Sequence, residues 1–493
     1  MKNKLKRTLT TLSWALAALV ATADTFTWTG GAVDEGGYTG ASGFFSNAAN
    51  WGASTFPGAA TNDVVFNLPD AFTVRLGMTV TNNALSITAG KVTLDIGTNE
   101  VYQLRANATL AATTPCSLSV ASGIFTLTNG LLYVGNSTTA RSNTVVVAPG
   151  ASLAVKALSF GKWSASPPLA FNGLAATNAT LVLKQSAVGD NSILIEGAGA
   201  TLELSGGSVS GYGRMTFNGK GNTLILRGGA QYDNVGLVYF NGIQNAIEIT
   251  GSNTLFVTRN DHFGLSNAGT SNTVLVADGG KWEARSLNAS FTIGRYTKYN
   301  TFVVGNGGCL DVSSQSLVIG SENTLRVERG GVVKSSTGIS PSGLFHIRGG
   351  FVDNGASLYM NPTADNPGAS VVVEDNAVVT NGYFRADSTL APMTLEFRVK
   401  DEGFVPMKVR VSNGWRNTAQ FKLVVDASEF AAAGGVGRTV ALVDRNGVQT
   451  GGSYLAEIPS ENIVVFPKGS KIIQTPTAIQ IRILHDCTVL TIR

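Results

Sequence analysis

Three ionisable residues recur at one position of a repeated sequence phrase, which makes them the strongest candidates for chemistry. Glu283, Asp311 and Lys334 each lie three residues after the second glycine of a Gly-Gly pair. If successive repeats stack, these three side chains become neighbours. Two adjacent carboxylates could hold Ca²⁺ through their oxygens or act as an acid–base pair on a glycoside. The alternative is a surface ladder in which Lys334 relieves the repulsion between Glu283 and Asp311, and we expect no metal, cofactor or catalytic site here.

The histidines offer one further cluster, at Arg259-Asn260-Asp261-His262. An acid beside a histidine can support general acid–base catalysis, but one loop supplies no second group to complete a site. The other histidines, His346 and His485, are far away in the sequence. Zinc-protease, paired-cysteine and serine-hydrolase motifs are missing from the sequence, so these site classes find no support.

The elements that position these residues come from a repeat. Asn272-Thr273, Asn300-Thr301 and Asn323-Thr324 each open a short run of β-branched and aliphatic residues that ends at a Gly-Gly turn. Similar phrases start at Asn143 and Asn222, and looser ones at Asn178 and Asn253. The clearest spacings, 28 and 23 residues, match a coil of short strands with glycine at its corners.

Such a coil cannot bury its own inner face, so neighbouring coils must stack. Stacked coils place equivalent residues about 4.8 Å apart. We therefore expect Asn272, Asn300 and Asn323 to form a buried ladder in which each amide bonds the next coil. This pattern resembles the right-handed parallel β-helix of autotransporter passenger regions and related secreted bacterial repeat proteins. The resemblance covers about residues 70–390 and implies the handedness of the coil.

The two flanks of the repeat differ from it. Residues 24–68 contain Trp28 and Trp51 and resemble the opening segment of secreted proteins with autotransporter-associated strand repeats. The two tryptophans are expected to cap the first coil, with an aromatic sugar platform as the alternative. From about Met393 the strands alternate between apolar and polar residues, which predicts antiparallel pairing in a β-sandwich-like cap over 393–493. The predicted class is therefore all-β, with β-helix repeats over 69–392.

The first 23 residues have the features of a secretory signal peptide. Basic residues at positions 2, 4, 6 and 7 precede a short apolar run, and Ala21-Thr22-Ala23 matches a signal-peptidase site. No later run is long enough to span a membrane, so we expect no transmembrane segment in the mature chain. The three cysteines, Cys116, Cys309 and Cys487, are too few and too far apart for a disulfide framework.

Composition limits the remaining functions. Lys and Arg total 36 against 32 Asp and Glu, but the predicted signal peptide holds four of the bases and no acid. The mature chain is then neutral, and only 14% of the full chain is charged, which argues against nucleic-acid binding. We expect a secreted or cell-surface, adhesin-like structural β-solenoid whose partners are glycans or other surface proteins. The alternative is a polysaccharide-binding or polysaccharide-degrading protein on the same scaffold.

Overall fold

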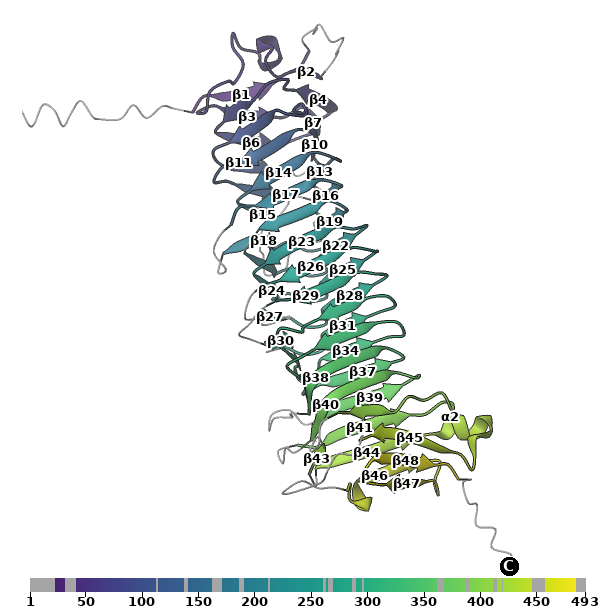
Figure 1. Cartoon of the computed structure of the whole chain (residues 1–493). Coiled ribbons are helices and arrows are strands. Elements are labelled where there is room, and N and C mark those ends of the chain that lie inside the picture. The colour runs from purple at the N-terminus through teal and green to yellow at the C-terminus, as the bar shows by residue number, and fades with distance from the viewer. Residues whose placement is uncertain are drawn as a thin grey trace, which may run out of the picture.

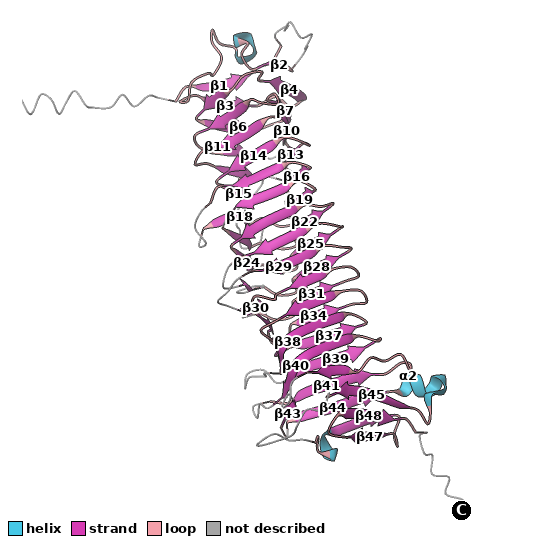
Figure 2. Ribbon diagram, in the orientation of Figure 1, coloured by secondary structure: helices cyan, strands magenta, loops and turns pink. Residues whose placement is uncertain are grey.

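The computed structural model describes residues 23–31, 41–111, 114–136, 141–161, 171–185, 190–211, 213–259, 263–264, 269–285, 290–294, 297–360, 368–386, 391–410, 415–418, 420–445 and 457–484. The predicted signal peptide, Asn260 to His262, His485 and Cys487 lie outside these ranges, apart from residue 23. The described chain is an all-β solenoid in which three short strands per coil form three faces of an elongated rod (Figures 1 and 2). No helix of the described residues is long and apolar enough to cross a bilayer.

Face A holds one row of parallel strands from the first coil onward. Its strands are β1 (Thr25–Trp28), β3 (Asp63–Phe66), β6 (Ala84–Ile87), β9 (Ala108–Leu110), β12 (Leu131–Val134), β15 (Ala157–Phe160), β18 (Asn191–Ile195), β21 (Arg214–Phe217) and β24 (Leu237–Phe240). The row is continued by β27 (Phe263–Gly264), which lies beside β24, then by β30 (Ser290–Ile293), β33 (Ser316–Ile319), β36 (Ile339–Pro341) and β43 (Trp415–Asn417).

Face B is the most regular row and runs the whole length of the rod. Its strands are β2 (Gly43–Phe44), β4 (Ala71–Arg75), β7 (Lys91–Asp95), β10 (Ser117–Ser122), β13 (Thr144–Val147), β16 (Gly173–Thr177), β19 (Thr201–Ser205), β22 (Thr223–Arg227), β25 (Ala246–Thr250), β28 (Thr273–Ala277), β31 (Thr301–Val304), β34 (Thr324–Val327), β37 (Leu344–Arg348), β39 (Ala369–Glu374), β41 (Met393–Arg398), β44 (Phe421–Asp426) and β46 (Ile463–Phe466).

Face C carries the candidate acids. Its strands are β5 (Val80–Asn82), β8 (Val101–Leu104), β11 (Ile124–Leu127), β14 (Ser152–Val155), β17 (Thr180–Leu183), β20 (Ser208–Gly211), β23 (Gln231–Val235), β26 (Leu255–Thr258), β29 (Lys281–Ala284), β32 (Cys309–Asp311), β35 (Val332–Ser335), β38 (Phe351–Tyr359), β40 (Val378–Ala386), β42 (Met407–Val409), β45 (Thr439–Asp444), β48 (Ala478–Arg482) and β47 (Lys471–Gln474). The long strands β38 and β40 also reach face A, where they pair with β36 and β43.

Alternation of side chains explains why this sequence closes into a rod. In most strands every second residue is buried, as in β31, where Phe302 and Val304 have no exposed surface. Period-two alternation sends these side chains to one face of each strand, and the coil turns that face inward. The result is one continuous core of stacked aliphatic and aromatic residues from Trp28 to Ile483. Each coil buries its apolar side chains against the coils above and below it.

A buried asparagine ladder follows the corner before face B. The backbone N–H and the side-chain amide of Asn272 donate to Oδ1 of Asn300, at 3.0 and 3.1 Å. Asn300 donates in the same way to Asn323, at 3.0 and 2.9 Å. All three residues are buried. The strands that follow them pair in register, with Thr273 opposite Thr301 and Thr301 opposite Thr324.

The ladder is longer than the sequence repeat indicates. Asn222 and Asn245 extend it upward, each with its N–H bonded to Oδ1 of the next asparagine. Further up, Asn143 and Asn172 form another rung, and the N–H of Cys116 donates to Oδ1 of Asn143 at 3.3 Å. The sequence repeat did not identify Asn172, Asn245 or Cys116 as ladder positions.

The backbone has a characteristic conformation at this corner. The residue before a ladder asparagine is in the left-handed region, with φ of 53° at Ser142, 58° at Ser271 and 62° at Tyr299. Asn178 and Asn253 were expected to be looser copies, but they are exposed, have positive φ themselves and precede strands of face C. They therefore lie at a different corner, and the expectation for them was wrong.

Antiparallel pairing beyond Met393 was predicted correctly for part of the segment only. Strand β48 pairs antiparallel with β45 and β47 on face C. Strands β41, β44 and β46 instead continue face B in parallel, and β42 pairs in parallel with β40 and β45. Alternation of polar and apolar residues reports one exposed face, and the outer wall of a solenoid satisfies that pattern as well as a sandwich does. Parallel pairing therefore passes both expected boundaries, at residues 68 and 392.

Short helical turns occur only near the two ends of the described chain. The turn η1 (Ala48–Trp51) starts at Asn47, whose side chain accepts from the Ala49 N–H. Near the other end lie α2 (Ser428–Phe430), η2 (Ala431–Gly435) and η3 (Ser460–Asn462). Figure 1 shows these turns at the top and bottom of the rod. The lateral faces are therefore formed by strands and by the loops that connect them.

We predict that Asn300→Ala lowers the free energy of unfolding by about 1–3 kcal/mol, because it leaves the buried amide groups of Asn272 without an acceptor. Asn129→Ala is the matched control, since Asn129 is exposed, and its cost should stay within about 0.5 kcal/mol. Urea denaturation of residues 24–493 measures both. Equal stabilities of the two variants would contradict a structural role for the ladder.

Candidate functional site

The structure brings Glu283, Asp311 and Lys334 together on the outer wall of face C. Glu283 on β29 lies opposite Asp311 on β32, and Asp311 lies opposite Lys334 on β35. The stacking register inferred from the Gly-Gly turns therefore holds at this position. Neighbouring parallel strands are about 4.8 Å apart, so the two carboxylates belong to adjacent coils.

A lysine that the sequence analysis did not single out lies between the two acids. Lys281 is two residues before Glu283 on β29, so its side chain points to the same face. Its Nζ lies 2.5 Å from Oε1 of Glu283 and 3.2 Å from Oδ2 of Asp311. The residue type and the i, i+2 spacing were visible in the sequence, but the prediction was based on a single position of the repeat.

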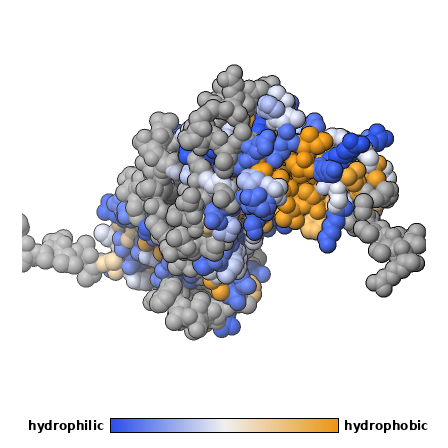
Figure 3. Space-filling model, turned by 90° about the horizontal axis from the view of Figure 1, so that it is seen from below, coloured by the Kyte–Doolittle hydropathy of each residue, from blue (hydrophilic) through white to orange (hydrophobic). Residues whose placement is uncertain are grey.

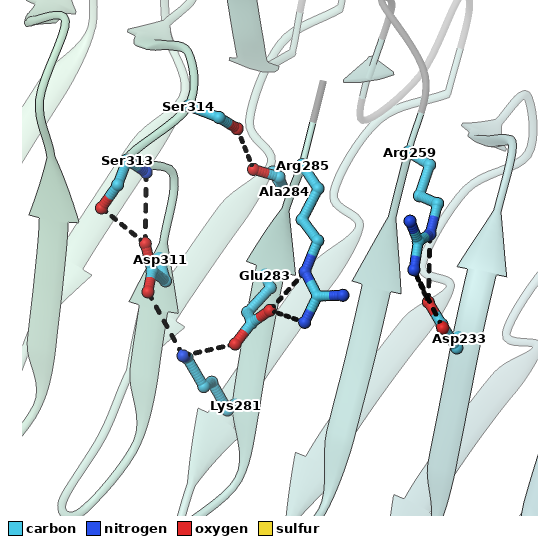
Figure 4. Close-up of polar contacts among 9 residues, drawn as sticks. All are labelled: Asp233, Arg259, Lys281, Glu283, Ala284, Arg285, Asp311, Ser313 and Ser314. Carbon is cyan, nitrogen blue, oxygen red and sulfur yellow. Dashed lines mark hydrogen bonds and ion pairs between the residues drawn. The ribbon is translucent and has the colours of Figure 1, made fainter. Parts of the chain in front are cut away.

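The remaining oxygens of the two acids also have partners (Figure 4). Nε of Arg285 donates to Oε2 of Glu283 at 2.6 Å, and the Arg285 guanidinium forms a second contact with the same oxygen. Oδ1 of Asp311 accepts from Oγ of Ser313 at 2.7 Å and from its backbone N–H at 3.2 Å. The acids therefore belong to a network of ion pairs and hydrogen bonds across two coils.

This network lowers the pKa values of both carboxyl groups. Burial raises the pKa of Glu283, but hydrogen bonds from Lys281 and Arg285 outweigh burial and hold that pKa below its ordinary value. Burial likewise raises the pKa of Asp311, while bonds from Ser313 and Lys281 bring it below its ordinary value. For Lys281, burial lowers the pKa, and the two carboxylates outweigh it and raise the pKa.

The arrangement stabilises two carboxylates and does not poise either of them as an acid. A glycosidase needs one carboxyl group with a raised pKa to protonate the leaving group. Here both pKa values move the other way. The ammonium of Lys281 also occupies the space between the carboxylates that a bound cation would need. Within the described part of the chain, no group of three or more His, Cys, Asp or Glu residues could hold a metal ion.

The network borders a polar recess. Its walls are Glu283, Ala284 and Arg285 from β29 and the residue after it, with Asp311, Ser313 and Ser314 from the next coil. The recess has a volume of about 210 Å³. Oγ of Ser314 donates to the Ala284 carbonyl at 2.7 Å and so ties the two coils together. The recess could accept hydroxyl groups of a ligand, because its rim offers charged donors and acceptors.

The histidine cluster is described only in part. Arg259 forms a bidentate ion pair with Asp233 on β23, with Nη2 at 2.9 and 3.0 Å from the two carboxylate oxygens (Figure 4). Arg259 therefore belongs to the charged outer wall of face C. Elsewhere, Nε2 of His346 on β37 lies 3.4 Å from Oε2 of Glu374 on β39. This pairing was not predicted, because the prediction considered only the position three residues after each Gly-Gly pair, and neither residue lies there.

Glu374 and Asp375 anchor an ion-pair cluster on face B. Glu374 is buried, and Nη1 of Arg398 lies 3.0 Å from its Oε2. Nε of Arg348 lies 3.2 Å from Oε1 of Glu374 and 2.9 Å from Oδ2 of Asp375. Lys400 completes the cluster at 3.0 Å from Oδ1 of Asp375. The cluster crosses three coils, so it ties strands β37, β39 and β41 together.

The two N-terminal tryptophans lie inside the first coils. Trp28 is fully buried and Trp51 is 4% exposed, with ring centroids 4.8 Å apart in an edge-to-face arrangement. Nε1 of Trp28 donates to the Ala41 carbonyl, and Nε1 of Trp51 donates to the Phe45 carbonyl. Both ring faces are packed in the core, so neither offers the flat surface that stacking on a sugar requires.

Two of the three cysteines can be placed, and both are free thiols. Cys116 is buried at the ladder corner, where its Sγ lies 3.0 Å from Oδ1 of Asn143. Cys309 is half-buried on the outer wall of face C, opposite Lys281. Burial raises the pKa of the Cys309 thiol, which disfavours the reactive thiolate form.

Comparisons of the chain with models of protein families, with curated proteins and with solved structures found no match. The function is therefore inferred from the geometry of this chain.

We predict that Lys281→Met destabilises the fold by about 0.5–1 kcal/mol at pH 7, the range of partly exposed ion pairs. The pKa values of Glu283 and Asp311 are lowered in the fold, so their ion pairs stabilise it fully above the ordinary carboxyl pKa. That stabilisation is lost as the pH falls through the lowered values. Denaturation should be measured at several pH values between 2.5 and 7. The difference in free energy of unfolding between Lys281→Met and the unsubstituted chain should become smaller as the pH falls.

Lys334→Met is the matched control, because Lys334 makes no ion pair within the described residues. Its effect should stay below about 0.5 kcal/mol at every pH. A loss on Lys281→Met that is the same at pH 2.5 and pH 7 would contradict the electrostatic account.

Proposed function

We propose that the chain is a secreted or cell-surface structural protein, an adhesin-like rod without catalytic activity. The observation that carries the proposal is the parallel pairing of face B, which runs from β2 to β46 and gives one long body (Figure 1). A stack of coils with a continuous core keeps its two ends apart at a fixed distance. Such a body suits a spacer whose lateral faces contact glycans or other surface proteins.

The sequence alone supports the part of the proposal that concerns export. The basic start, the apolar run and Ala21-Thr22-Ala23 predict removal of residues 1–23 before Asp24. What remains has as many bases as acids, so it lacks the strong field that attracts nucleic acid. A neutral and charge-poor surface suits close contact with other surfaces.

The export proposal predicts that cells producing the full chain release a protein that begins Asp24-Thr25-Phe26. Small residues are needed at the first and third positions before the cleaved bond, so Ala23→Asp should block processing. Thr22→Asp at the tolerant position between them is the matched control. N-terminal sequencing and cell fractionation provide the readout, and an intact chain retained in the cytoplasm would contradict the proposal.

The polar recess beside Glu283 and Asp311 favours a second candidate, a protein that binds or degrades extracellular polysaccharide. Its rim carries Arg285, Ser313 and two carboxylates, all of which can bond sugar hydroxyls. The lowered pKa values of both acids support binding more than hydrolysis. Both candidate functions use the same solenoid fold and the same location outside the cell.

A reducing-sugar assay on the mature chain separates the two candidates. The structural proposal predicts no release of reducing ends from plant, host or bacterial polysaccharides, with or without Ca²⁺. Turnover that is abolished by Glu283→Gln and by Asp311→Asn would instead establish the enzymatic candidate. The double substitution Asp233→Asn, Arg259→Gln is a control for general change to face C, because it removes an ion pair outside the recess.

A further inference from the structure

The hydrophobic core is covered differently at the two ends of the rod. At the N-terminal end, Trp28, Trp51 and Phe45 are buried and close the first coils with edge-to-face contacts. At the other end, face B stops at β46, which pairs only with β44 among the described strands. The inward side chains Ile463 and Val465 are half-buried there. Their counterparts one coil above have no exposed surface.

The outward side of β46 is apolar as well. Val464 is 40% exposed and Phe466 is 43% exposed, and both are large hydrophobic residues. Ile473 on β47, the next strand along the chain, is 36% exposed. Figure 3 looks at this end of the rod and shows apolar side chains gathered on it. Beside the strand, Phe466, Pro467 and Leu484 border a recess of about 670 Å³.

The backbone of β46 determines which groups reach its free edge. The Phe466 carbonyl accepts from the Ala427 N–H at 2.9 Å, on the side of β44. Backbone groups alternate between the two edges of a strand, so those of Val464 also face β44. The C=O of Ile463 and both backbone groups of Val465 are then directed to the free edge, while the Ile463 N–H donates to the Ser460 carbonyl of the turn η3. An unpaired apolar edge of this kind is a template for another strand.

We propose that a second copy of the chain pairs with this edge, with β46 antiparallel to β46 of the partner about a two-fold axis at Val464. In this register the Val465 N–H of each copy donates to the Ile463 carbonyl of the other, while the Ile463 N–H keeps its bond to the Ser460 carbonyl, so both edge N–H groups have a partner. An axis at Val465 would use Pro467, which has no N–H. An axis at Ile463 would use Glu461, which belongs to the turn η3. The register centred on Val464 is therefore the one that places both edge residues of β46 opposite edge residues of the partner's β46.

Charge at the ends of β46 favours the same partner. The strand itself is uncharged, while the exposed Glu461 precedes it and the exposed Lys468 follows it. Neither takes part in an ion pair within the described chain. Antiparallel pairing brings Glu461 of each copy to the end of the partner strand that carries Lys468. A two-fold interface of this kind is self-complementary, so it closes after two copies and does not form a fibre.

The test is sedimentation velocity of residues 24–493 over a range of concentrations from about 1 to 100 µM. We expect a dimer that dissociates on dilution. Val464→Lys places two like charges on the axis and should raise the dissociation constant about tenfold or more. Val464 is already exposed, so circular dichroism should show an unchanged fold. Phe351→Lys is the matched control, since Phe351 is 39% exposed on face C, and it should leave the dimer intact.

Charge reversal tests the register. Glu461→Lys and Lys468→Glu should each weaken the dimer, and the double variant should restore it. Vesicles of phosphatidylglycerol are included to test whether the apolar end binds lipid instead. A chain that stays monomeric at 100 µM, a dimer that survives Val464→Lys, or a monomer that binds the vesicles through this end would each overturn the proposal.

Discussion

The structure depends on one constraint: the buried polar groups at the corner before face B bond to the coils above and below. Asn272 is fully buried, and its N–H and side-chain amide both bond to the side-chain oxygen of Asn300. A buried amide without such a partner would cost about 1–3 kcal/mol. The corner therefore fixes the register of every strand that follows it, and the apolar columns of the core can align.

Much of this organisation could be predicted from the sequence, because the ladder repeats the same residue type at the same corner. Asn272, Asn300 and Asn323 share a phrase with their following strands, and so the register of Glu283 and Asp311 could be counted. Asn245 was not identified, since Ala246 follows it where the phrase has threonine. The left-handed residue before each ladder position is a better signal, but it is a property of the backbone and not of any one residue type.

Two parts of the structure could not be predicted from the sequence: the ion pairs of Lys281 and the direction in which the C-terminal strands pair. Both depend on contacts between residues of different coils. The role of Lys281 needs the side-chain geometry that places its amine between two acids on different strands. The parallel pairing of β41, β44 and β46 was missed because alternation alone does not distinguish the outer wall of a solenoid from a sandwich. The direction in which two strands pair depends on the path of the chain that connects them. The residue pattern within a single strand does not reveal that path.

The account is tested most directly by hydrogen–deuterium exchange of the mature chain, measured at the ladder corner. The backbone amides of Asn245, Asn272 and Asn300 should exchange as slowly as those of the core strands, because each donates to the asparagine of the next coil. In Asn323→Ala, the Asn300 amide should lose its protection before that of Asn245 does. Exchange at the rate of exposed loops in the unsubstituted chain would contradict the stacked ladder and the rod that depends on it.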